Sequence, residues 1–531
     1  MYHWRSTGTF TKFIALIPHL RSMGVTQVVL LPIFDRGRVG RKGTIGSPYA
    51  VRNPFVLDDD LAEPSIAMST EEQAKAMVEA LHLAGISVVL EVALRTASLD
   101  SDLVSHAPHW FYWVKQQQLN GGSLRAPAFT APQLERIHAM IASDDRRSLP
   151  EPNPSYIHMF SRPPAEVFLD ERGWYGYDAD GDIVRLPGAF ADWPPDDPQP
   201  AWTDVTYLRL HQHTDLLYPA YNTIRMFDER LEHDECKQWD LWNILAQVIP
   251  HYQRTLNIDG AMIDMGHALP LALRHEILLR AREHFPDFVI YEECFELDSR
   301  LAKQGVDAVV GYLPHVSRSY MGLADFVNRC SRHDVPISYF GAVDSHNTPR
   351  IATTYTANAG FAVWWFLSLL PRALPYMVAG FELGETCPIN TGLDFQTDEI
   401  EYYQEHGLPL FDNVPMQWLS TSNVLTQMQH RQRLESLWQI IRDLDEDDDV
   451  TILQCLPSGV LGYVRSPQRS RRGVVVCLNL TTRDVNVTLS RSTIVEASAV
   501  AGVVRDANEI ILRVSAESCR VVPVLRCSPS K

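Results

Sequence analysis

The pattern of apolar positions near the start of the chain predicts two buried strands separated by a helix. Residues 27–34 (QVVLLPIF) and 86–94 (ISVVLEVAL) are continuous apolar runs, which are typical of strands covered on both faces. Between these runs, Ser69 is followed three residues later by Glu72, which is the pattern of a helix capping box. Gly85 then marks a helix end. This order of elements is typical of a parallel α/β sheet.

The same alternation resumes in the second half of the chain. A helix is predicted over residues 235–254 and another over 361–370. Short strand-like runs lie at residues 260–265, 288–293, 308–312, 337–343 and 374–379. With Tyr2–Trp4 as the first strand, the count reaches the eight βα units that close into a (β/α)8 TIM barrel. An open doubly wound sheet would need a glycine-rich first turn, and the chain contains no GxGxxG.

Two features of this assignment are less regular. The predicted helices over residues 11–23 and 235–254 contain Pro18 and Pro250, and an internal proline removes a helical hydrogen bond. The first strand, Tyr2–Trp4, has almost no residues before it. A late start codon or a missing amino-terminal segment would account for this beginning, and we expect this strand to be frayed or unpaired.

Changes in composition divide the chain into three units. Residues 1–95 and 235–440 form the predicted catalytic barrel. Residues 96–234 are rich in proline and aromatic residues and are too long for a loop, so they are predicted to form an inserted subdomain over the barrel mouth. The acidic run at 443–449 is interpreted as a solvated linker or helix end. Apolar residues then alternate with period two, which predicts a carboxy-terminal antiparallel β domain over 450–531.

Charge and cysteine content restrict the class of function. The chain has 47 Lys and Arg against 65 Asp and Glu, a net charge of −18, which argues against a nucleic-acid partner. No apolar run is long enough for a transmembrane helix or signal peptide, so we expect a soluble cytoplasmic protein without a membrane partner. The eight cysteines stand singly, with no zinc-like spacing, so free thiols are expected, and neither a metal nor a cofactor is predicted. Oligomeric state is not readable from the sequence.

Acidic and polar side chains follow several of the predicted barrel strands. Since the carboxyl ends of barrel strands share one mouth, we expect these side chains to converge there. The candidates are Glu91, Arg95, Asp264, His267, Glu292, Glu293, Asp344, His346 and Asn347. Paired carboxylates, one ionised and one protonated, are the groups that cleave glycosidic bonds. The alternative is that these acids only pair with nearby arginines or cap the following helices.

Several segments resemble the spaced sequence regions of the α-amylase superfamily, glycoside hydrolase family 13. They are KGTIGSPYAV, VVLEVALRTAS, IDGAMIDMGHALP, VIYEECF, DSHNTPR, LPYMVAGFELGE and NTGLDF, in the order of the family, and the resemblance covers roughly residues 1–440. The residues of three segments are most similar to the maltosyltransferase branch: ALRTAS, DWPPDDPQPAW and MIDMGHALP.

The resemblance implies catalytic roles for two carboxylates. Asp264 matches the nucleophile of the family at the end of strand four, and Glu293 matches the acid/base at the end of strand five. Glu292 is the second candidate for the acid. An aromatic residue two positions after the acid is the family spacing, and Phe295 therefore favours Glu293.

The resemblance also implies substrate-binding residues. Tyr49 and His346 match residues that line the sugar next to the scissile bond. Asn347 stands where the family has its third carboxylate, and its amide can hydrogen-bond sugar hydroxyl groups without carrying charge. Asp344 and Glu91 complete the predicted substrate-binding set.

Other positions depart from the family pattern. The arginine two residues before the nucleophile is Met262 here, and the strand-three Asp, Asn and His are matched by Glu91, Arg95 and Thr96. Residues four apart on a strand point to one side, so we hypothesise that Arg95 supplies near Asp264 the cation that Met262 lacks. The alternative is that Arg95 pairs only with Glu91 or a loop acid. Because the family places a calcium ligand at the position of Arg95, no calcium site is expected.

The sequence thus predicts a retaining enzyme that acts on maltooligosaccharides or other α-glucans through a glycosyl-enzyme intermediate. The resemblance to maltosyltransferases favours a transglycosidase over an α-amylase-type hydrolase. A catalytically silent glucan-binding or regulatory protein is the remaining alternative, which the changes at Met262 and Asn347 support.

Overall fold

The computed structural model describes most of the barrel and parts of the other units. The described residues are 8–43, 45–119, 129–143, 149–189, 203–219, 229–386, 432, 434–442, 444–466, 472–490, 496–497, 503–505 and 509–525. The predicted first strand Tyr2–Trp4 and the segments DWPPDDPQPAW and NTGLDF lie outside these residues.

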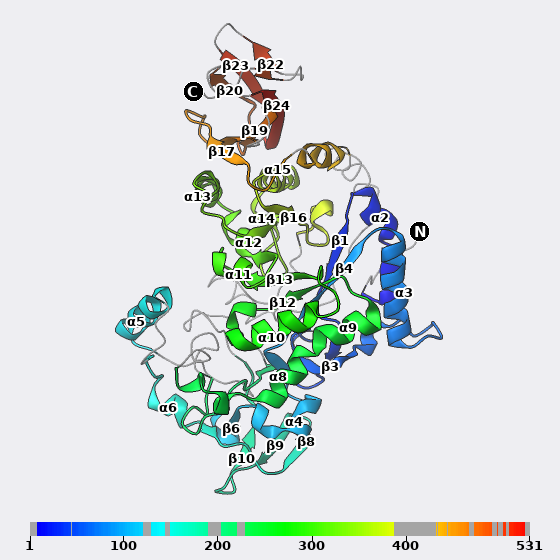
Figure 1. Ribbon diagram of the computed structural model, residues 1–531, viewed down its shortest axis with the longest axis vertical. Helices are drawn as coiled ribbons and strands as arrows, with labels where there is room; N and C mark the ends of the chain where they lie inside the picture. The colour runs from blue at the N-terminus through cyan, green and yellow to red at the C-terminus, as the bar shows by residue number, and fades with distance from the viewer. Residues whose placement is uncertain are drawn as a thin grey trace.

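A curled parallel sheet of seven strands forms the centre of the molecule (Figure 1). Its order is β1 (Gln27–Leu30), β4 (Ser87–Val92), β12 (Gly260–Ile263), β13 (Val289–Cys294), β14 (Ala308–Gly311), β15 (Ser338–Gly341) and β16 (Ala373–Pro375). Every neighbouring pair runs parallel. This sheet has the arrangement of a (β/α)8 barrel, as the sequence pattern predicts.

Helices connect these strands and cover the outside of the sheet (Figure 1). They include α3 (Thr70–Leu83), α10 (Leu271–Arg282), α11 (Ser299–Lys303), α12 (Tyr312–Val316), α13 (Tyr320–Ser331), α14 (Ile351–Thr354) and α15 (Ala357–Ser368). The predicted capping box is confirmed, because the Ser69 side chain accepts from the Glu72 backbone N–H while the Glu72 carboxylate accepts from the Ser69 backbone N–H. α3 is therefore fixed at its start by its own sequence.

Two predicted helices are each divided in the structure, so their prediction as single helices was wrong. Residues 11–23 contain α1 (Phe10–Ile14) and α2 (Ile17–Ser22), and Pro18 lies in the first turn of α2. Residues 235–254 contain α8 (Trp239–Ala246) and the start of α9 (Val248–Leu256), with Pro250 in the first turn of α9. A proline is tolerated in the first turn, where its missing N–H has no helical partner to lose.

The strand predicted over residues 27–34 is also shorter than expected. β1 ends at Leu30, and Phe34 begins β2 (Phe34–Arg36), which pairs antiparallel with β3 (Val51–Leu57) outside the barrel sheet. Pro32 lies between the two strands and cannot donate to a strand ladder. The strands β2 and β3 thus form a two-stranded sheet separate from the barrel sheet.

The chain leaves the barrel after β5 (Thr96–Ser98) and forms a second, antiparallel sheet. Its order is β7 (Phe160–Ser161), β6 (Trp113–Lys115), β10 (Ile183–Arg185), β9 (Gly173–Tyr177) and β8 (Val167–Asp170). The helices of this region are α4 (Asp102–His106), α5 (Ala131–Ala142) and α6 (Pro154–Ile157). β11 (Val205–Tyr207) then returns to pair with β5. In Figure 1 this region lies at the end of the molecule opposite the carboxy terminus.

The carboxy-terminal region consists of two antiparallel sheets, as its period-two pattern predicts. One sheet has the order β17 (Asp449–Ile452), β18 (Val460–Ser466), β19 (Arg472–Asn479), β24 (Ser518–Leu525) and β21 (Glu496–Ala497). The other has the order β20 (Val485–Ser490), β23 (Glu509–Val514) and β22 (Val503–Arg505). The first of these sheets packs on α15 through β19 and β24, and the second lies beyond it at the top of Figure 1.

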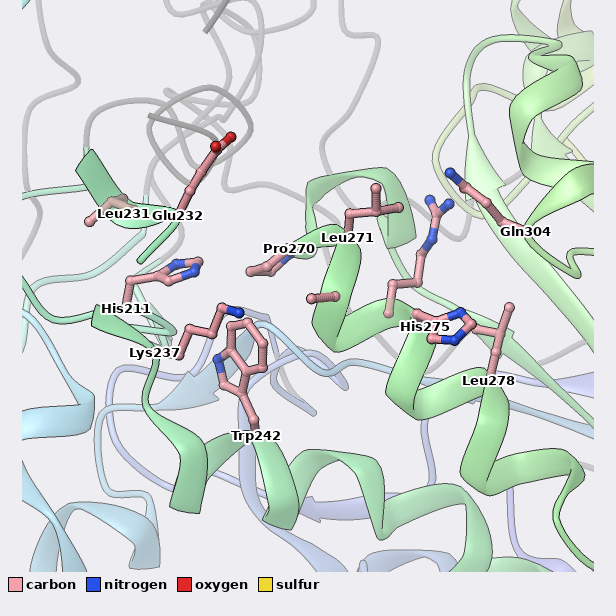
Figure 2. A pocket seen from close by; sticks show the side chains of 12 residues that line it. His211, Leu231, Glu232, Lys237, Trp242, Pro270, Leu271, His275, Leu278 and Gln304 are labelled. Atoms are coloured by element: carbon pink, nitrogen blue, oxygen red, sulfur yellow. The ribbon is translucent and has the colours of Figure 1, made fainter. Parts of the chain in front are cut away.

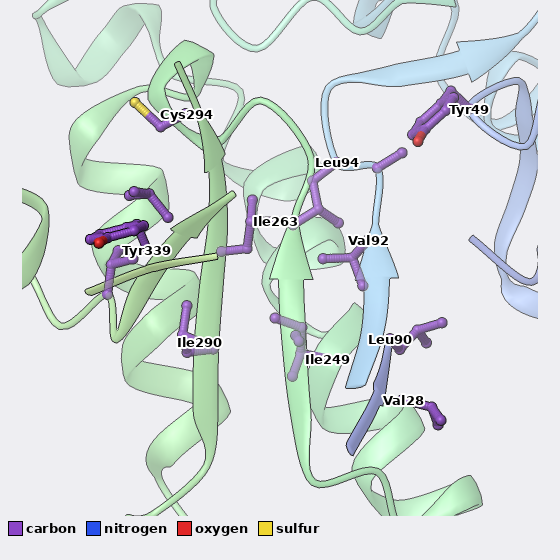
Figure 3. Packing of buried hydrophobic residues seen from close by; sticks show 14 of the residues in the cluster. Val28, Tyr49, Leu90, Val92, Leu94, Ile249, Ile263, Ile290, Cys294 and Tyr339 are labelled. Atoms are coloured by element: carbon purple, nitrogen blue, oxygen red, sulfur yellow. The ribbon is translucent and has the colours of Figure 1, made fainter. Parts of the chain in front are cut away.

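The barrel sheet has two apolar layers, one on each of its faces. Outward-facing residues such as Leu90, Ile263 and Ile290 pack in the main core with the surrounding helices (Figure 3). Inward-facing residues form a smaller core inside the sheet: Val89, Met262, Tyr291, Ala308, Val310 and Phe340. Met262 therefore contributes to the apolar floor of the barrel.

The described cysteines are all free thiols, four buried, one intermediate and one exposed. Within the described ranges, no helix is both long and apolar enough to cross a membrane.

Candidate active site

Three carboxyl groups lie inside the barrel, directly above its apolar floor. In the sheet register, Met262 of β12 pairs with Glu91 of β4 and with Tyr291 of β13. Side chains alternate along a strand, so Asp264 and Glu293, each two residues further on, point to the same inner side as Glu91. All three residues are buried. Of the predicted strand-end acids, Glu91, Asp264 and Glu293 thus lie together inside the barrel.

Asp264 and Glu293 form a close pair of carboxyl groups. Burial, the negative charge of Asp264 and a side-chain hydrogen bond with Asp264 raise the pKa of Glu293 to about 8. The Met265 backbone N–H and the Arg95 guanidinium act in the opposite direction and lower this pKa. Glu293 is therefore the protonated partner at neutral pH, because its pKa lies above 7.

The loop after β12 holds the Glu293 carboxyl group through its backbone. Met265 has a left-handed conformation with φ of 43°, which is uncommon for a residue with a side chain. In this conformation its N–H donates to Glu293 Oε2 at 3.2 Å. A Cβ atom at Gly266 would lie 2.5 Å from Cδ of Glu292, so only glycine fits at this close approach. The loop geometry therefore depends on both residues.

Glu292 points away from the barrel interior. Its Oε1 accepts from Arg274 Nη1 of α10 at 3.1 Å in a buried ion pair. Burial raises the pKa of Glu292 to about 7, although Arg274 lowers it. Since neighbouring residues on a strand face opposite sides, Glu292 and Glu293 cannot both enter the site. This geometry agrees with the choice of Glu293 as the acid.

Arg274 also borders a cavity of about 520 Å³ on the helical side of the barrel (Figure 2). His211, Lys237 and Trp242 line its other side, while α10 contributes residues from Pro270 onward. This cavity lies on the face of β13 that carries Glu292, because Arg274 reaches it from α10. It is therefore separate from the inward-facing carboxyl groups.

Tyr49 joins Glu91 to His346 at the barrel mouth. Its hydroxyl group donates to Glu91 Oε1 at 2.8 Å and lies 2.8 Å from Nε2 of His346. Burial lowers the pKa of His346 to about 4, so the imidazole is neutral at pH 7. Burial, together with the charges of Asp264 and Glu293, raises the pKa of Glu91 well above its usual value. The structure thus places three of the predicted substrate-binding residues in one hydrogen-bonded group.

Asn347 hydrogen-bonds Glu293, and Arg95 acts on Glu293 through its charge. The Arg95 guanidinium is 5.8 Å from the ring centroid of Tyr207 and lowers the pKa of Glu293. Asn347 Nδ2 donates to Glu293 Oε1 at 2.8 Å. Arg95 therefore acts electrostatically on the carboxylate pair. That it compensates for Met262 at Asp264 itself stays a hypothesis.

Asp344 lies apart from the carboxyl group pair. Its Oδ2 is 3.8 Å from Nη1 of Arg350 and accepts from the backbone N–H of Ile351, the first residue of α14. Burial raises the pKa of Asp344 to about 6, although Arg350 lowers it. Asp344 thus makes the contacts expected under the alternative interpretation, in which a strand-end acid pairs with an arginine and accepts a hydrogen bond at a helix start.

Two contributors to the site were not predicted from the sequence. Met265 acts through its backbone N–H, which carries no residue-type signal. Tyr207 lies in the return strand β11, far from Arg95 along the chain. Gly266, directly after Met265, is a local sequence signal for a tight turn at this position.

Two groups of known proteins are similar to this chain over part of its sequence. No protein-family profile matches the chain. A glycogen debranching enzyme from Yersinia pestis is 37% identical over 100 residues, 18% of this chain and 15% of that protein. An alpha-1,4-glucan:maltose-1-phosphate maltosyltransferase from Cereibacter sphaeroides is 32% identical over 116 residues, 20% of this chain and 19% of that protein. The matched segments thus span less than a fifth of these relatives.

Solved structures match over nearly the whole chain. An α-amylase from Lactobacillus plantarum has a TM-score of 0.61 and 15% identity, covering 98% of this chain and 97% of its own. A maltogenic α-amylase from Thermotoga neapolitana has a TM-score of 0.59 and 15% identity, covering 99% and 98%. A debranching enzyme from Nostoc punctiforme has a TM-score of 0.57 and 13% identity, covering 97% and 89%. The chain has the fold of the α-amylase superfamily, and its sequence is similar to glycogen debranching enzymes and to a maltosyltransferase.

Proposed function

We propose that the protein is a retaining enzyme acting on α-1,4-glucans, with Asp264 as nucleophile and Glu293 as acid/base. The observation that carries this proposal is the hydrogen-bonded pair of carboxyl groups inside the barrel. One member of the pair has a pKa of about 8 and is protonated at neutral pH, which leaves the other to act as the anion. A pair with separated protonation states is the requirement for glycosidic bond cleavage.

The closeness of the two groups supports retention of configuration. An inverting enzyme needs its carboxyl groups about 6.5–9.5 Å apart, because a water molecule must enter between acid, base and substrate. A retaining enzyme has a shorter separation of about 5–5.5 Å, because one carboxylate attacks the sugar directly. Side chains that share a hydrogen bond leave no room for such a water between them.

The reaction then proceeds in two steps. Asp264 attacks the anomeric carbon and forms a glycosyl-enzyme ester, while Glu293 transfers its proton to the departing glycosidic oxygen. An acceptor hydroxyl group then attacks the same carbon, Glu293 removes the acceptor proton, and the Asp264 carboxylate leaves. Each step forms one bond to the anomeric carbon and breaks one, and the second step restores both carboxyl groups.

The remaining site residues orient the substrate. Neutral His346 and the Tyr49 hydroxyl group lie next to Glu91 and offer hydrogen bonds to sugar hydroxyl groups without adding charge. Asn347 keeps an amide donor on Glu293. Arg95 supplies positive charge near the pair and favours the ionised form of a carboxylate there, as the nucleophile requires. These contacts support an active site in a chain that has Met262 and Asn347 at two family positions.

We further propose that the acceptor is another sugar, so that the enzyme is a maltosyltransferase-like transglycosidase. The residues of these motifs and the similarity to the Cereibacter sphaeroides maltosyltransferase support transfer of the glycosyl group to a sugar. The name of that relative also gives maltose 1-phosphate as a donor to be tested. With this donor, the same two steps release inorganic phosphate and lengthen the glucan by a maltosyl unit. Hydrolysis by water at the second step is the competing outcome.

The test is to incubate the protein with maltoheptaose, with and without maltose 1-phosphate, and to resolve the products by chain length. Products stepped by two glucose units support maltosyl transfer, and free maltose or glucose indicates hydrolysis. An unchanged ladder together with measurable glucan binding would favour a silent protein and overturn the proposal. The Asp264→Asn variant is the control, since turnover that survives this change would contradict the nucleophile assignment.

A further inference from the structure

We propose that the outer face of the β8–β9 hairpin is a second glucan-binding surface, separate from the barrel mouth. The surface is formed by Phe168, Tyr175 and Tyr177, which we call the aromatic strip. This inference rests on the proposed function for the identity of the ligand. It assigns to the protein a place where a long α-glucan is held while its end reaches the catalytic pair.

The three rings of the aromatic strip lie on one face of the sheet. Phe168 pairs directly with Tyr175 across the two strands, and Tyr177 follows Tyr175 by two residues, so all three share a face. Their ring centroids are 5.5 Å apart for Phe168 and Tyr175 and 6.2 Å apart for Tyr175 and Tyr177. The rings thus form a continuous surface.

The strip is exposed although its residues are large and apolar. Phe168 is 43% exposed and Tyr177 is 51% exposed. The opposite face of the hairpin is the one that packs on the rest of the molecule, because Trp174 contacts the main core and its Nε1 donates to the Ser101 carbonyl group at 2.9 Å. The rings thus face outward from a sheet whose inner face is already packed, and they are available to contact a narrow ligand.

A charged pair beside the strip, on the same face of the sheet, holds Tyr175 in place. Arg185 lies on the same face, opposite Tyr175 in β10, and its guanidinium is 4.9 Å from the Tyr175 ring centroid. Asp170 accepts from both terminal nitrogens of Arg185, at 2.9 and 2.5 Å. A bidentate contact of this kind fixes the guanidinium plane, and the plane supports the Tyr175 ring. Tyr175 is therefore ordered before any ligand arrives.

The chemistry of the strip fits a neutral polyhydroxyl chain. Arg185, the cation that packs on Tyr175, is paired with Asp170, and the three rings of the strip themselves carry no charge. Aromatic faces pack against the C–H faces of sugar rings, and the hydroxyl groups of Tyr175 and Tyr177 can donate to sugar oxygens. The structure gives neither hydroxyl group a partner among the described residues. A glucan chain meets both requirements.

A second copy of the protein fits less well. Three partly exposed rings of this size offer roughly 250 Å² of accessible surface. A stable protein interface needs about 800 Å² from each partner. β8 is an edge strand of only four residues, which is also short for pairing with another chain. The surface area therefore favours a narrow ligand.

The test compares a Phe168→Ala/Tyr177→Ala variant with a Leu169→Ala control. Leu169 lies on the same strand, points to the opposite face and is 51% exposed, so it matches the loss of an exposed apolar side chain. Binding to glycogen and amylose is measured by affinity electrophoresis, with the Asp264→Asn change present throughout to prevent turnover. We expect the double variant to bind about tenfold more weakly and the Leu169→Ala control to bind like the parent protein.

Activity on short substrates separates this inference from the proposed function. The double variant should keep the maltotriose activity of the parent and lose efficiency only on glycogen, through a higher KM. Equal glycogen binding by the double variant and the parent would overturn the inference, even if both are active. Light scattering gives a further outcome. If the parent protein is a dimer and the double variant is a monomer, the strip is a contact between two copies of the chain, and the inference is overturned. If the parent and all variants are inactive, but the double variant still binds glycogen more weakly than the parent, only the proposed function is overturned. Unfolding temperatures confirm that both variants are folded.

Discussion

The Glu293 carboxyl group receives opposing influences from its neighbours, and their balance sets the pH at which it loses its proton. Burial and Asp264 favour the protonated form, while the Met265 N–H and the Arg95 guanidinium favour the anion. Glu91 adds a third carboxyl group to the same space, and the charges of Asp264 and Glu293 raise its own pKa. Burial and the nearby carboxyl groups outweigh the effect of Arg95. They keep Glu293 protonated at neutral pH, as an acid catalyst requires.

The effect of Arg95 on this balance can be tested through the pH dependence of activity. Removing the cation in Arg95→Leu takes away a group that lowers the pKa of Glu293, so this pKa rises. The alkaline limb of kcat/KM, expected near pH 8, should then move to higher pH. Arg95→Lys keeps the charge and should leave the limb close to its original position. A limb that does not move in Arg95→Leu would show that Arg95 has no electrostatic role at the pair.

Glu293 should also make stability depend on pH. Its folded pKa is about 8, against 4.5 for a free glutamate, so between these values the folded protein binds more protons than the unfolded chain. The free energy of unfolding therefore falls as pH rises through this window. Glu293→Gln removes this contribution, so urea unfolding at pH 5.5 and 8.5 should differ less in the variant than in the parent. An identical difference in both proteins would contradict the assigned protonation of Glu293.

At this scale the sequence predicts which side chains enter the site but not how they are connected. Alternation along β4 and β13 is enough to place Glu91 and Glu293 inside the barrel. The bond between Tyr49 and His346 joins residues 297 positions apart, and no local pattern specifies it. The partner of Asp344 is not foreseen for a related reason, because Arg350 lies at a helix start whose position depends on packing.

The strand β13 and helix α10 are joined by the buried pair Glu292–Arg274. Arg274→Met would leave the Glu292 carboxyl group buried without its counterion, which costs about 3–5 kcal/mol of unfolding free energy. Adding Glu292→Gln should recover much of this loss, because the buried charge is then removed as well. Chemical denaturation of the single and double variants measures both effects.

The matched control for this pair is Arg280→Met on the same helix. Arg280 pairs with Glu276 four residues away, and both side chains are partly exposed, at 37% and 36%. Loss of such a pair costs about 0.5 kcal/mol or less. Equal losses in Arg274→Met and Arg280→Met would show that the Glu292 pair contributes no more than a surface contact.

The capping box at the start of helix α3 is formed by residues three positions apart, and its contribution to stability can be tested. Ser69→Ala removes the side chain that accepts from the Glu72 N–H and should lower the free energy of unfolding by about 1 kcal/mol. Glu72→Gln keeps a side-chain acceptor for the Ser69 N–H and should cost less. Denaturant midpoints of the two variants give the comparison. A larger loss in Glu72→Gln would contradict the capping role of Ser69.

Elements with local signals are the ones that the sequence predicts well. The capping box of α3 and the period-two carboxy-terminal strands are specified by neighbouring residues. The division of residues 235–254 into α8 and α9 is different, because the apolar stripe continues across Gln247. Pro250 indicates a break but not its position, since a proline fits at any place in a first turn. Packing against α10 and α3 accompanies the observed break.

At the scale of the whole molecule, the carboxy-terminal sheets and the barrel share one core. Tyr463, Val474 and Val476 belong to the same apolar cluster as the barrel residues of α15. Polar contacts cross the same boundary, because the Tyr463 hydroxyl group donates to the Phe366 carbonyl group at 2.7 Å. Arg465 donates to the Leu369 carbonyl group at 2.7 Å and to Asp448 at 2.8 Å. Units that share a core in this way are expected to unfold together.

This coupling predicts a single cooperative thermal transition for the whole chain. Arg465→Met breaks a buried ion pair and leaves the Leu369 carbonyl group without its donor, so it should lower the unfolding temperature of that one transition. Arg513→Met is the control, because its pair with Asp484 lies in the same region but in solvent, and it should change the transition little. Scanning calorimetry distinguishes the outcomes. Two separate transitions, of which Arg465→Met moves only one, would show that the sheets unfold independently and that their shared core does not couple them to the barrel.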